Sequence, residues 1–166
     1  MLSVLLRIFG ILLMLTALAV PLARAPDRAP ESLVARWAPR PSELVEVGGM
    51  AVHLRDEGPR NDPTPLLMLH GLGSSLHTWE GWAAGLRGQR RVIRLDLPGA
   101  GLTGPWAGGY PADDYRSETL ARFTLDLMDA LKLRRVVLVG HSLGGEVAWQ
   151  LASRQPERIE RLVLLD

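Results

Sequence analysis

The fold of this chain is decided by one stretch, Val136-Val137-Leu138-Val139-Gly140-His141-Ser142-Leu143-Gly144. Its four leading apolar residues predict a buried strand, and the residues from 143 onward predict a helix. A serine between two glycines at such a junction is typical of a nucleophile elbow, in which a strained turn lifts the hydroxyl above the sheet. Side chains at positions 140 and 144 would collide with neighbouring elements. The stretch therefore indicates Ser142 as a nucleophile, and the alternative is an ordinary strand–turn–helix junction that happens to hold a serine.

Apolar runs and helical periodicities alternate along the rest of the chain. Short, nearly continuous apolar runs predict strands that are covered on both faces, as in a parallel sheet, and they lie at 66–69, 92–95, 136–139 and 162–165. Helical spacing predicts helices over 79–86, over 117–131 with Ser117 as N-cap, and over 143–154. This alternation predicts an α/β fold with a doubly wound, mostly parallel sheet.

A β-hairpin is predicted ahead of the first buried strand. The runs 43–47 and 50–55 consist of β-type residues and flank a pair of glycines at 48 and 49. Their polar/apolar alternation predicts an antiparallel edge with one face in water. Before the hairpin, five prolines between positions 21 and 41 predict a semi-rigid tether. Within it, Leu33, Val34 and Trp37 could form the apolar face of a short helix.

The N-terminal segment is predicted to lie outside the globular fold. Residues 8–20 are apolar or small and suit a signal-peptide core, while the stretch 1–22 could span a bilayer if Arg7 snorkels. Ala23-Arg24-Ala25 resembles a small-x-small cleavage site, but Pro26 follows immediately. We therefore favour an uncleaved anchor over a cleaved signal.

The chain is accordingly divided into an anchor or signal segment (1–23), a proline-rich tether (24–42) and a globular domain (43–166). The expected location is a membrane of the bacterial inner-membrane type, and the alternative is a secreted or periplasmic protein. The sequence leaves open on which side of the membrane the domain lies.

Composition excludes several classes of function. The length of 166 residues allows one domain, and 47% hydrophobic residues are enough for a core. A net charge of +1 and the lack of a basic run interleaved with aromatics argue against nucleic acid as a partner. The absence of cysteine excludes disulfides, thiolate metal sites and a cysteine nucleophile, and the four histidines lack metal-site spacing. We therefore expect neither a metal nor a cofactor.

A second segment suits the stabilisation of negative charge near Ser142. The turn Leu69-His70-Gly71-Leu72-Gly73-Ser74-Ser75 follows the first buried strand. A glycine-rich turn there can aim a backbone N–H at an oxyanion, and the N–H of Leu143 can supply a second donor. An ordinary strand-ending turn is the alternative for this segment. After the strand at 92–95, Asp96 opens the loop 96–104, and we interpret Asp96 as a structural hydrogen-bonding residue.

Taken in order, these segments resemble the α/β-hydrolase fold family. Leu-His-Gly at 69–71, Asp-Leu-Pro-Gly-x-Gly at 96–101 and Gly-His-Ser-Leu-Gly-Gly at 140–145 each follow a predicted strand, and the resemblance covers roughly residues 43–166. It implies Ser142 as nucleophile and the backbone N–H groups of Leu72 and Leu143 as oxyanion hole. The supporting residues of the two turns are then His70, Gly71, Gly73, Gly140, His141 and Gly144. Serine in place of aspartate points away from dehalogenases and epoxide hydrolases, toward esterases, lipases and C–C bond hydrolases.

The sequence departs from the family pattern after Ser142. The family's triad runs serine, then acid, then histidine along the chain, but no histidine follows Ser142. Among the later acids, Glu146, Glu157 and Glu160 are interpreted as surface charges, and Asp166 is a poor candidate for the triad. We therefore expect the chain to be the front portion of a longer protein, to lack the triad acid and base, and to be inactive by itself.

The resulting hypothesis is a membrane-anchored serine hydrolase that acts on an ester or related small-molecule acyl substrate. Two alternatives stay open: a non-catalytic ligand-binding protein on the same scaffold, and an acyltransferase or perhydrolase that uses the same serine. A histidine and an acid after Asp166 would separate the hydrolase from the binding protein, and product analysis would separate it from the transferase.

Overall fold

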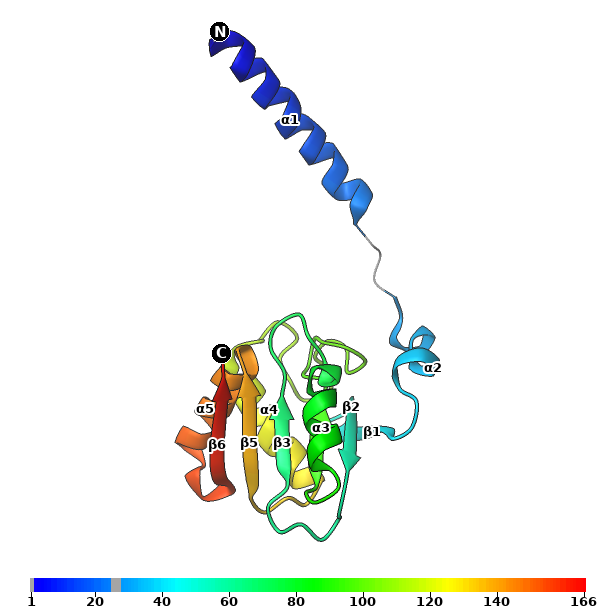
Figure 1. The fold of residues 1–166 in the computed structure, drawn as a ribbon, viewed down its shortest axis with the longest axis vertical. Helices are drawn as coiled ribbons and strands as arrows, with labels where there is room; N and C mark the ends of the chain where they lie inside the picture. Colours follow the sequence, from blue (N-terminus) through cyan, green and yellow to red (C-terminus); the bar gives the residue numbers. More distant parts are fainter. Residues whose placement is uncertain (1, 25–27) are drawn as a thin grey trace.

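The computed structural model describes residues 2–24 and 28–166, and its globular part is built on one mixed sheet (Figure 1). The strands of this described part are β1 (Ser42–Val47), β2 (Met50–Glu57), β3 (Leu66–Leu69), β4 (Val92–Leu95), β5 (Val136–His141) and β6 (Ile159–Leu165). Their order across the sheet is β1-β2-β4-β3-β5-β6. β2 pairs antiparallel with β1 and β4, and the other neighbours are parallel. The predicted α/β class with a mostly parallel sheet is confirmed.

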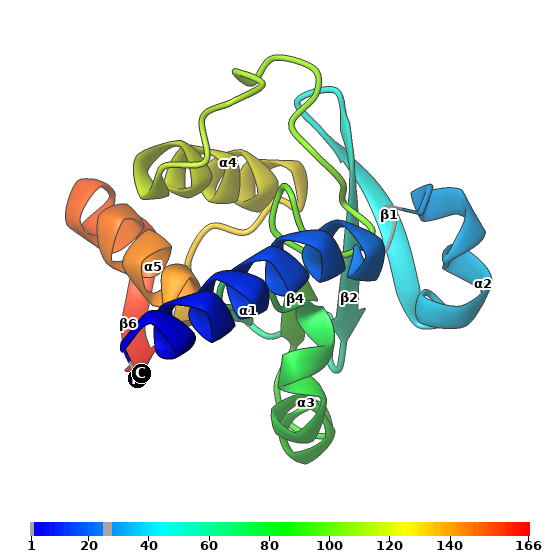
Figure 2. The same ribbon diagram turned by 90° about the horizontal axis from the view of Figure 1, so that it is seen from above.

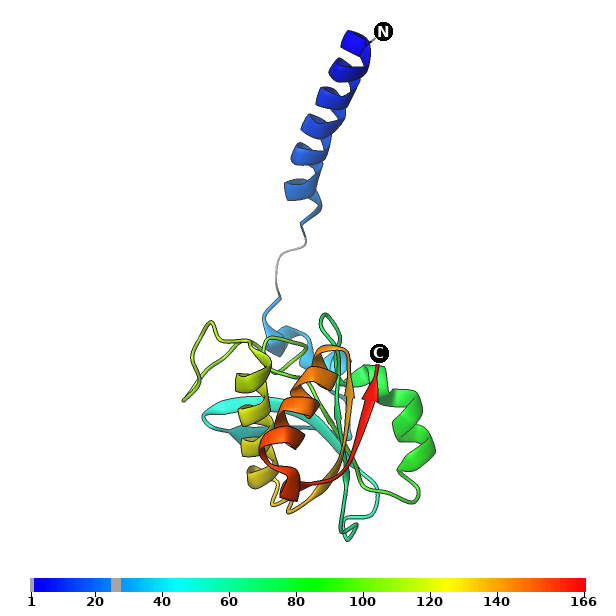
Figure 3. The ribbon, with the colours of Figure 1, turned by 90° about the vertical axis from the view of Figure 1, so that its left-hand side faces the viewer.

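Helices cover both faces of this sheet. α3 (Glu80–Leu86) lies on one face, while α4 (Ser117–Ala130) and α5 (Leu143–Arg154) lie together on the other (Figure 2; Figure 3). The larger hydrophobic core includes Phe123 of α4 and Leu151 of α5. A smaller core contains Ala83 of α3 together with Trp79 from the turn before it. The central strands β3 and β4 are consequently buried at every position, as their apolar runs predict.

The parallel register brings the candidate motifs to one edge of the sheet. Leu69 at the end of β3 lies beside Gly140 near the end of β5, and Met68 lies beside Arg94 of β4. The glycine-rich turn, the Asp96 loop and the Ser142 elbow therefore all leave the sheet at its carboxyl edge. Ligands of open α/β sheets bind outside this edge.

The N-terminal part consists of α1 (Leu2–Ala23), a 3₁₀ turn (Pro30–Ser32) and the short helix α2 (Val34–Trp37). α1 buries none of its residues in the protein, and its length and composition would allow it to cross a membrane. The same properties fit a signal sequence. Part of the expected cleavage site, at positions 25 and 26, falls outside the described residues. α2 confirms the short helix expected within the tether.

Five details differ from the sequence-based prediction. Arg116, not Ser117, is the N-cap of α4, and the helix ends at Ala130. A 3₁₀ turn (Leu76–Trp79) precedes α3, which therefore begins at Glu80.

The other two differences concern burial of the strands. The hairpin forms as expected, but β2 has no wet face, because it pairs with β4 inside the sheet, and Ala51 is its one exposed residue. The run predicted to be buried at 162–165 is only partly covered, since Leu164 of β6 is 48% exposed.

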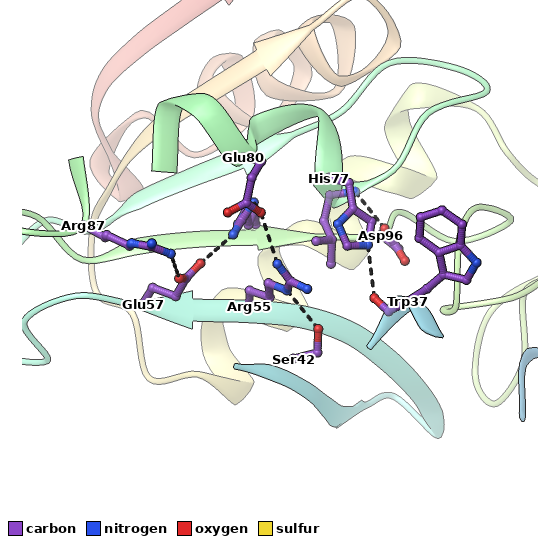
Figure 4. A network of polar contacts seen from close by, with 10 residues as sticks. Trp37, Ser42, Arg55, Glu57, His77, Glu80, Arg87 and Asp96 are labelled. Atoms are coloured by element: carbon purple, nitrogen blue, oxygen red, sulfur yellow. Dashed lines mark hydrogen bonds and ion pairs between the residues drawn. The ribbon is translucent and has the colours of Figure 1, made fainter. Parts of the chain in front are cut away.

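A buried cation fastens β4 to its neighbours. The side chain of Arg94 is fully buried and pairs with Glu57 of β2 at 2.6 Å and with Glu80 of α3 at 2.7 Å. Figure 4 shows Glu57 and Glu80 facing this network together with Arg55 and Arg87. Burial opposes ionisation of Glu57, but the hydrogen bonds from Arg94 and Arg87 lower the pKa of its carboxyl below the ordinary value. A buried charge is costly unless it is paired. The two Nη atoms of Arg94 are paired in this way, although its Nε has no partner among the described residues, and the two ion pairs join β2, β4 and α3.

Two glycines of the elbow are required by close backbone packing, as predicted. A Cβ at Gly144 would clash with the Leu69 and His70 carbonyl groups at the end of β3, and a Cβ at Gly140 would clash with the Gly144 carbonyl. Helix α5 therefore starts directly against the end of β3.

Replacing Gly144 by alanine should lower the free energy of unfolding by about 2 kcal/mol or more, because the new methyl group has no room. Gly85→Ala is the matched control: Gly85 lies in α3 with nothing near its missing Cβ, so alanine there should stabilise by about 0.5–1 kcal/mol. Thermal melting of the detergent-solubilised protein compares the two variants. Equal effects of both substitutions would contradict the packing described here.

Candidate active site

Ser142 occupies a strained position between β5 and α5. Its backbone angles are φ 50° and ψ −119°, a left-handed region that residues with side chains rarely adopt. Its N–H donates to the Leu165 carbonyl at 3.1 Å, and its own carbonyl accepts the N–H groups of Gly145 and Glu146. Such strain persists only where the surroundings fix it, and it gathers at functional sites. The strained turn that the sequence predicts between strand and helix is present at Ser142, and its role as a nucleophile stays a prediction.

The hydroxyl of Ser142 is available to solvent. Ser142 is exposed, and its side chain makes no capping hydrogen bond to α5. A serine that served only as a helix cap would bond to the N–H groups of the first turn. The position therefore presents an unengaged hydroxyl at the N-terminus of a twelve-residue helix, where the helix dipole favours negative charge.

The glycine-rich turn lies against this elbow. An added Cβ at Gly71 would stand 2.9 Å from Nδ1 of His141 and 3.2 Å from Cβ of Ser142, so the two turns are in contact. Gly73 has φ +68°, which only glycine adopts without strain. Among the described residues, the backbone N–H groups of Leu72 and Leu143 have no backbone acceptor, and Leu72 is 85% exposed. The N–H groups of Leu72 and Leu143 are therefore free to donate, and each belongs to one of the two turns that meet at Ser142.

His70 ties the glycine-rich turn to the loop after β4. Its Nε2 accepts the N–H of Leu97 at 3.0 Å, so the proton is on Nδ1, which donates to the Gly71 carbonyl at 2.8 Å. Burial lowers the pKa of His70 below 6.5, although the hydrogen bond to Gly71 and the Asp96 charge oppose this shift. Both ring nitrogens are thus engaged in a neutral ring, and His70 is a structural part of the turn rather than a base for Ser142.

Asp96 is structural, in agreement with its interpretation from the sequence. Its carboxylate accepts the backbone N–H groups of Leu76 and Leu102, and Nδ1–H of His53 at 2.7 Å. Burial would raise the pKa of Asp96, but these hydrogen bonds hold it below its usual value. His53 is the residue that sequence reasoning missed, because it is 43 positions from Asp96 and no motif joins them.

No hydrogen bond joins the later acids Glu146, Glu157 and Glu160 to the Ser142 hydroxyl among the described residues, and Asp166 directly follows Leu165, whose carbonyl accepts the Ser142 N–H. Glu146 is exposed and accepts a hydrogen bond from Ser117, which links α5 to α4. Glu157 and Glu160 are exposed, and Glu160 pairs with Arg135. We assign no general base within the described residues.

A comparison with known proteins establishes the family. The family model described as alpha/beta hydrolase fold matches residues 64–166, so this chain belongs to the α/β-hydrolase fold family. The chain is 34% identical over 132 residues to the 2-hydroxymuconate semialdehyde hydrolase of Pseudomonas sp. (strain CF600), and the match covers 77% of this chain and 44% of that protein. The chain therefore spans less than half the length of this curated relative.

Two solved structures are similar over large parts of the chain. A membrane phospholipase A, described as a novel bacterial virulence factor, has a TM-score of 0.68 and 30% identity over 95% of this chain and 50% of its own. An epoxide hydrolase mutant from Vigna radiata has a TM-score of 0.66 and 26% identity over 75% of this chain and 38% of its own. The relatives are thus hydrolases of several kinds, which supports hydrolase chemistry in general.

The neutral state of His70 should appear in the pH dependence of stability. The unfolded chain protonates His70 near pH 6.5 while the native protein resists protonation, so the free energy of unfolding should fall as the pH drops through about 6.5 toward the lower native pKa. In His70→Gln, the amide oxygen can still accept the Leu97 N–H but no group titrates. We expect this variant to be less stable at pH 8 and to lose less stability between about pH 7 and pH 5. If the melting temperatures of the two proteins fell equally between about pH 7 and pH 5, His70 would not be held neutral.

Proposed function

We propose that the native protein is a membrane-anchored serine hydrolase that cleaves an ester of an acyl lipid. The observation that carries the proposal is the strained, exposed Ser142 in contact with a glycine-rich turn. The strained backbone of Ser142 is explained if its free hydroxyl must project above the sheet to reach a substrate.

In this proposal Ser142 Oγ attacks the acyl carbon, and the carbonyl oxygen becomes an oxyanion. The N–H groups of Leu72 and Leu143 are the proposed donors to this oxyanion, at the positive end of the α5 dipole. The acyl–oxygen bond then breaks, the alcohol leaves with a proton, and water releases the acid from the acyl-enzyme. A general base must accept the serine proton in this scheme, and none is assigned among the residues that the structure describes.

The lipid substrate and the membrane location rest on the N-terminal helix. The match to the membrane phospholipase A leaves out only 5% of this chain, about eight residues, which is fewer than the 22 residues of α1. The similarity to the phospholipase A therefore includes part of α1. The matches to the other two relatives cover a smaller share of this chain, 77% and 75%. A catalytic domain tethered to a bilayer meets its substrate at the lipid surface.

A second candidate is a hydrolase of C–C bonds. It is favoured by the 34% identity to the 2-hydroxymuconate semialdehyde hydrolase, and it would use the same serine with a soluble substrate. An acyltransferase or perhydrolase, and a non-catalytic binding protein on the same scaffold, are the remaining alternatives.

A fluorophosphonate probe should label Ser142 of the native protein in membranes, and Ser142→Ala should abolish this labelling. Removal of a covalent nucleophile lowers the rate by orders of magnitude while the fold persists. Ser153→Ala is the control, since Ser153 is an exposed serine of α5. Labelling that survives in Ser142→Ala would overturn the assignment. Release of fatty acid from phospholipid vesicles, without turnover of a C–C bond substrate, would favour the lipid hydrolase over the second candidate.

The protein should sediment with membranes and be released by detergent but not by high salt. The reason is the apolar character of α1, whose burial in lipid does not depend on screened charges. Carbonate and salt washes followed by immunoblotting, with the N-terminus checked by mass spectrometry, make the measurement. Recovery in the salt wash with an intact N-terminus would contradict the anchor, and a processed N-terminus would indicate a signal peptide.

A further inference from the structure

The short helix α2 carries an exposed tryptophan beside an arginine. The side chain of Trp37 is 45% exposed, and the guanidinium of Arg36 stands over its ring, 5.0 Å from the centroid. A single exposed apolar side chain is ordinary on a protein surface, and Trp82 of α3 is 46% exposed as well. Trp37 differs from Trp82 in its place in the chain, because it lies between the apolar helix α1 and the globular domain.

The tether that contains this tryptophan is basic. Between positions 24 and 41 it holds four exposed arginines, namely Arg24, Arg28, Arg36 and Arg40. The acids of the same range are Asp27 and Glu31, so the arginines are in excess. Basic segments directly after a membrane helix are attracted to the anionic lipids of the bilayer surface, and each arginine near that surface strengthens the attraction about fivefold.

The chain keeps α2 close to the end of α1. Ten residues, 24–33, separate the two helices, and even a fully extended chain of this length spans no more than about 35 Å. The 3₁₀ turn at Pro30–Ser32 shortens this span. When α1 lies in a bilayer, α2 and its arginines are therefore within reach of the lipid headgroups.

Contacts with the domain fix α2 to the carboxyl edge of the sheet. Nε2 of His77 donates to the Trp37 carbonyl at 3.1 Å, and the two ring centroids are 5.9 Å apart (Figure 4). Leu33 and Trp37 line one cavity together with Ser75 and Leu102, which belong to the segments that follow β3 and β4. A surface that binds the exposed side of α2 therefore also sets the orientation of the carboxyl edge.

We propose that α2 docks on the headgroups of an anionic bilayer, with Trp37 at headgroup depth and Arg36 and Arg40 on lipid phosphates, so that the edge with Ser142 is turned toward the lipid. Tryptophan suits this depth because its ring is apolar and its N–H is polar. Arginine binds phosphate through paired N–H groups. The inference rests on the membrane anchor of the proposed function and adds to it one orientation of the domain.

Photo-cross-linking of the native protein in lipid vesicles tests this orientation. p-Benzoylphenylalanine replaces Trp37 or, as the control of equal exposure, Trp82. The vesicles consist of phosphatidylcholine and phosphatidylglycerol with clickable acyl chains. We expect several times more lipid adduct at position 37 than at position 82. Melting curves show whether α2 tolerates the new ring, and position 35, which is also exposed on α2, replaces position 37 if it does not.

Charge variants make the test specific for anionic headgroups. Arg36→Gln and Arg40→Gln should each lower the adduct yield at position 37, by up to about fivefold per arginine. Vesicles of phosphatidylcholine alone should lower it in the same way. Arg122→Gln and Arg154→Gln are the controls, since these arginines are exposed on α4 and α5, and they should leave the yield unchanged.

The outcomes separate the docking of α2 from the anchor. Equal lipid adducts at positions 37 and 82, an unchanged yield in uncharged vesicles, or cross-links from position 37 to a second copy of the protein in place of lipid would each overturn the docking. Protein that carbonate extracts from the vesicles would overturn the anchor and the docking together. Protein that stays in the vesicles and reacts with the fluorophosphonate probe, but forms no lipid adduct at position 37, would contradict the docking alone.

Discussion

The backbone conformation of Ser142 is the constraint on which the rest of the candidate site depends. A positive φ at a residue with a side chain costs about 1–3 kcal/mol, and the neighbouring elements hold it in place. The N–H of Ser142 is bonded to the Leu165 carbonyl of β6, and its carbonyl begins α5. Gly140 and Gly144 allow α5 to start against β3. The sheet, the helix and the two glycines together determine where one hydroxyl stands.

A second group of residues positions the loops around that hydroxyl. His70 joins the glycine-rich turn to the loop after β4 through both of its ring nitrogens. Asp96 gathers the N–H groups of Leu76 and Leu102 and the ring of His53. These buried hydrogen bonds at the carboxyl edge hold the loops in place, and Gly71 lies in contact with the elbow. The chemistry proposed for Ser142 therefore depends on how these residues hold the two turns together.

The sequence predicts the elements of the sheet and the elbow well, because their signals are local. The apolar run before Gly140 and the helical spacing after Leu143 are each contained in a short window, and β5 and α5 form there. Burial of whole strands is less predictable, since it depends on distant neighbours: β2 is covered because it pairs with β4, and Leu164 of β6 is exposed despite its apolar run. The His53–Asp96 pair and the Arg94 network were missed for the same reason, as their partners are far apart in sequence.

The most direct test of this account is a crystal structure of the native protein after reaction with a serine-directed phosphonate. A phosphorus–oxygen bond is expected at Ser142 Oγ. One phosphonyl oxygen is expected to lie about 2.7–3.1 Å from the backbone nitrogens of both Leu72 and Leu143. An adduct on another residue, or a phosphonyl oxygen turned away from both N–H groups, would contradict this account.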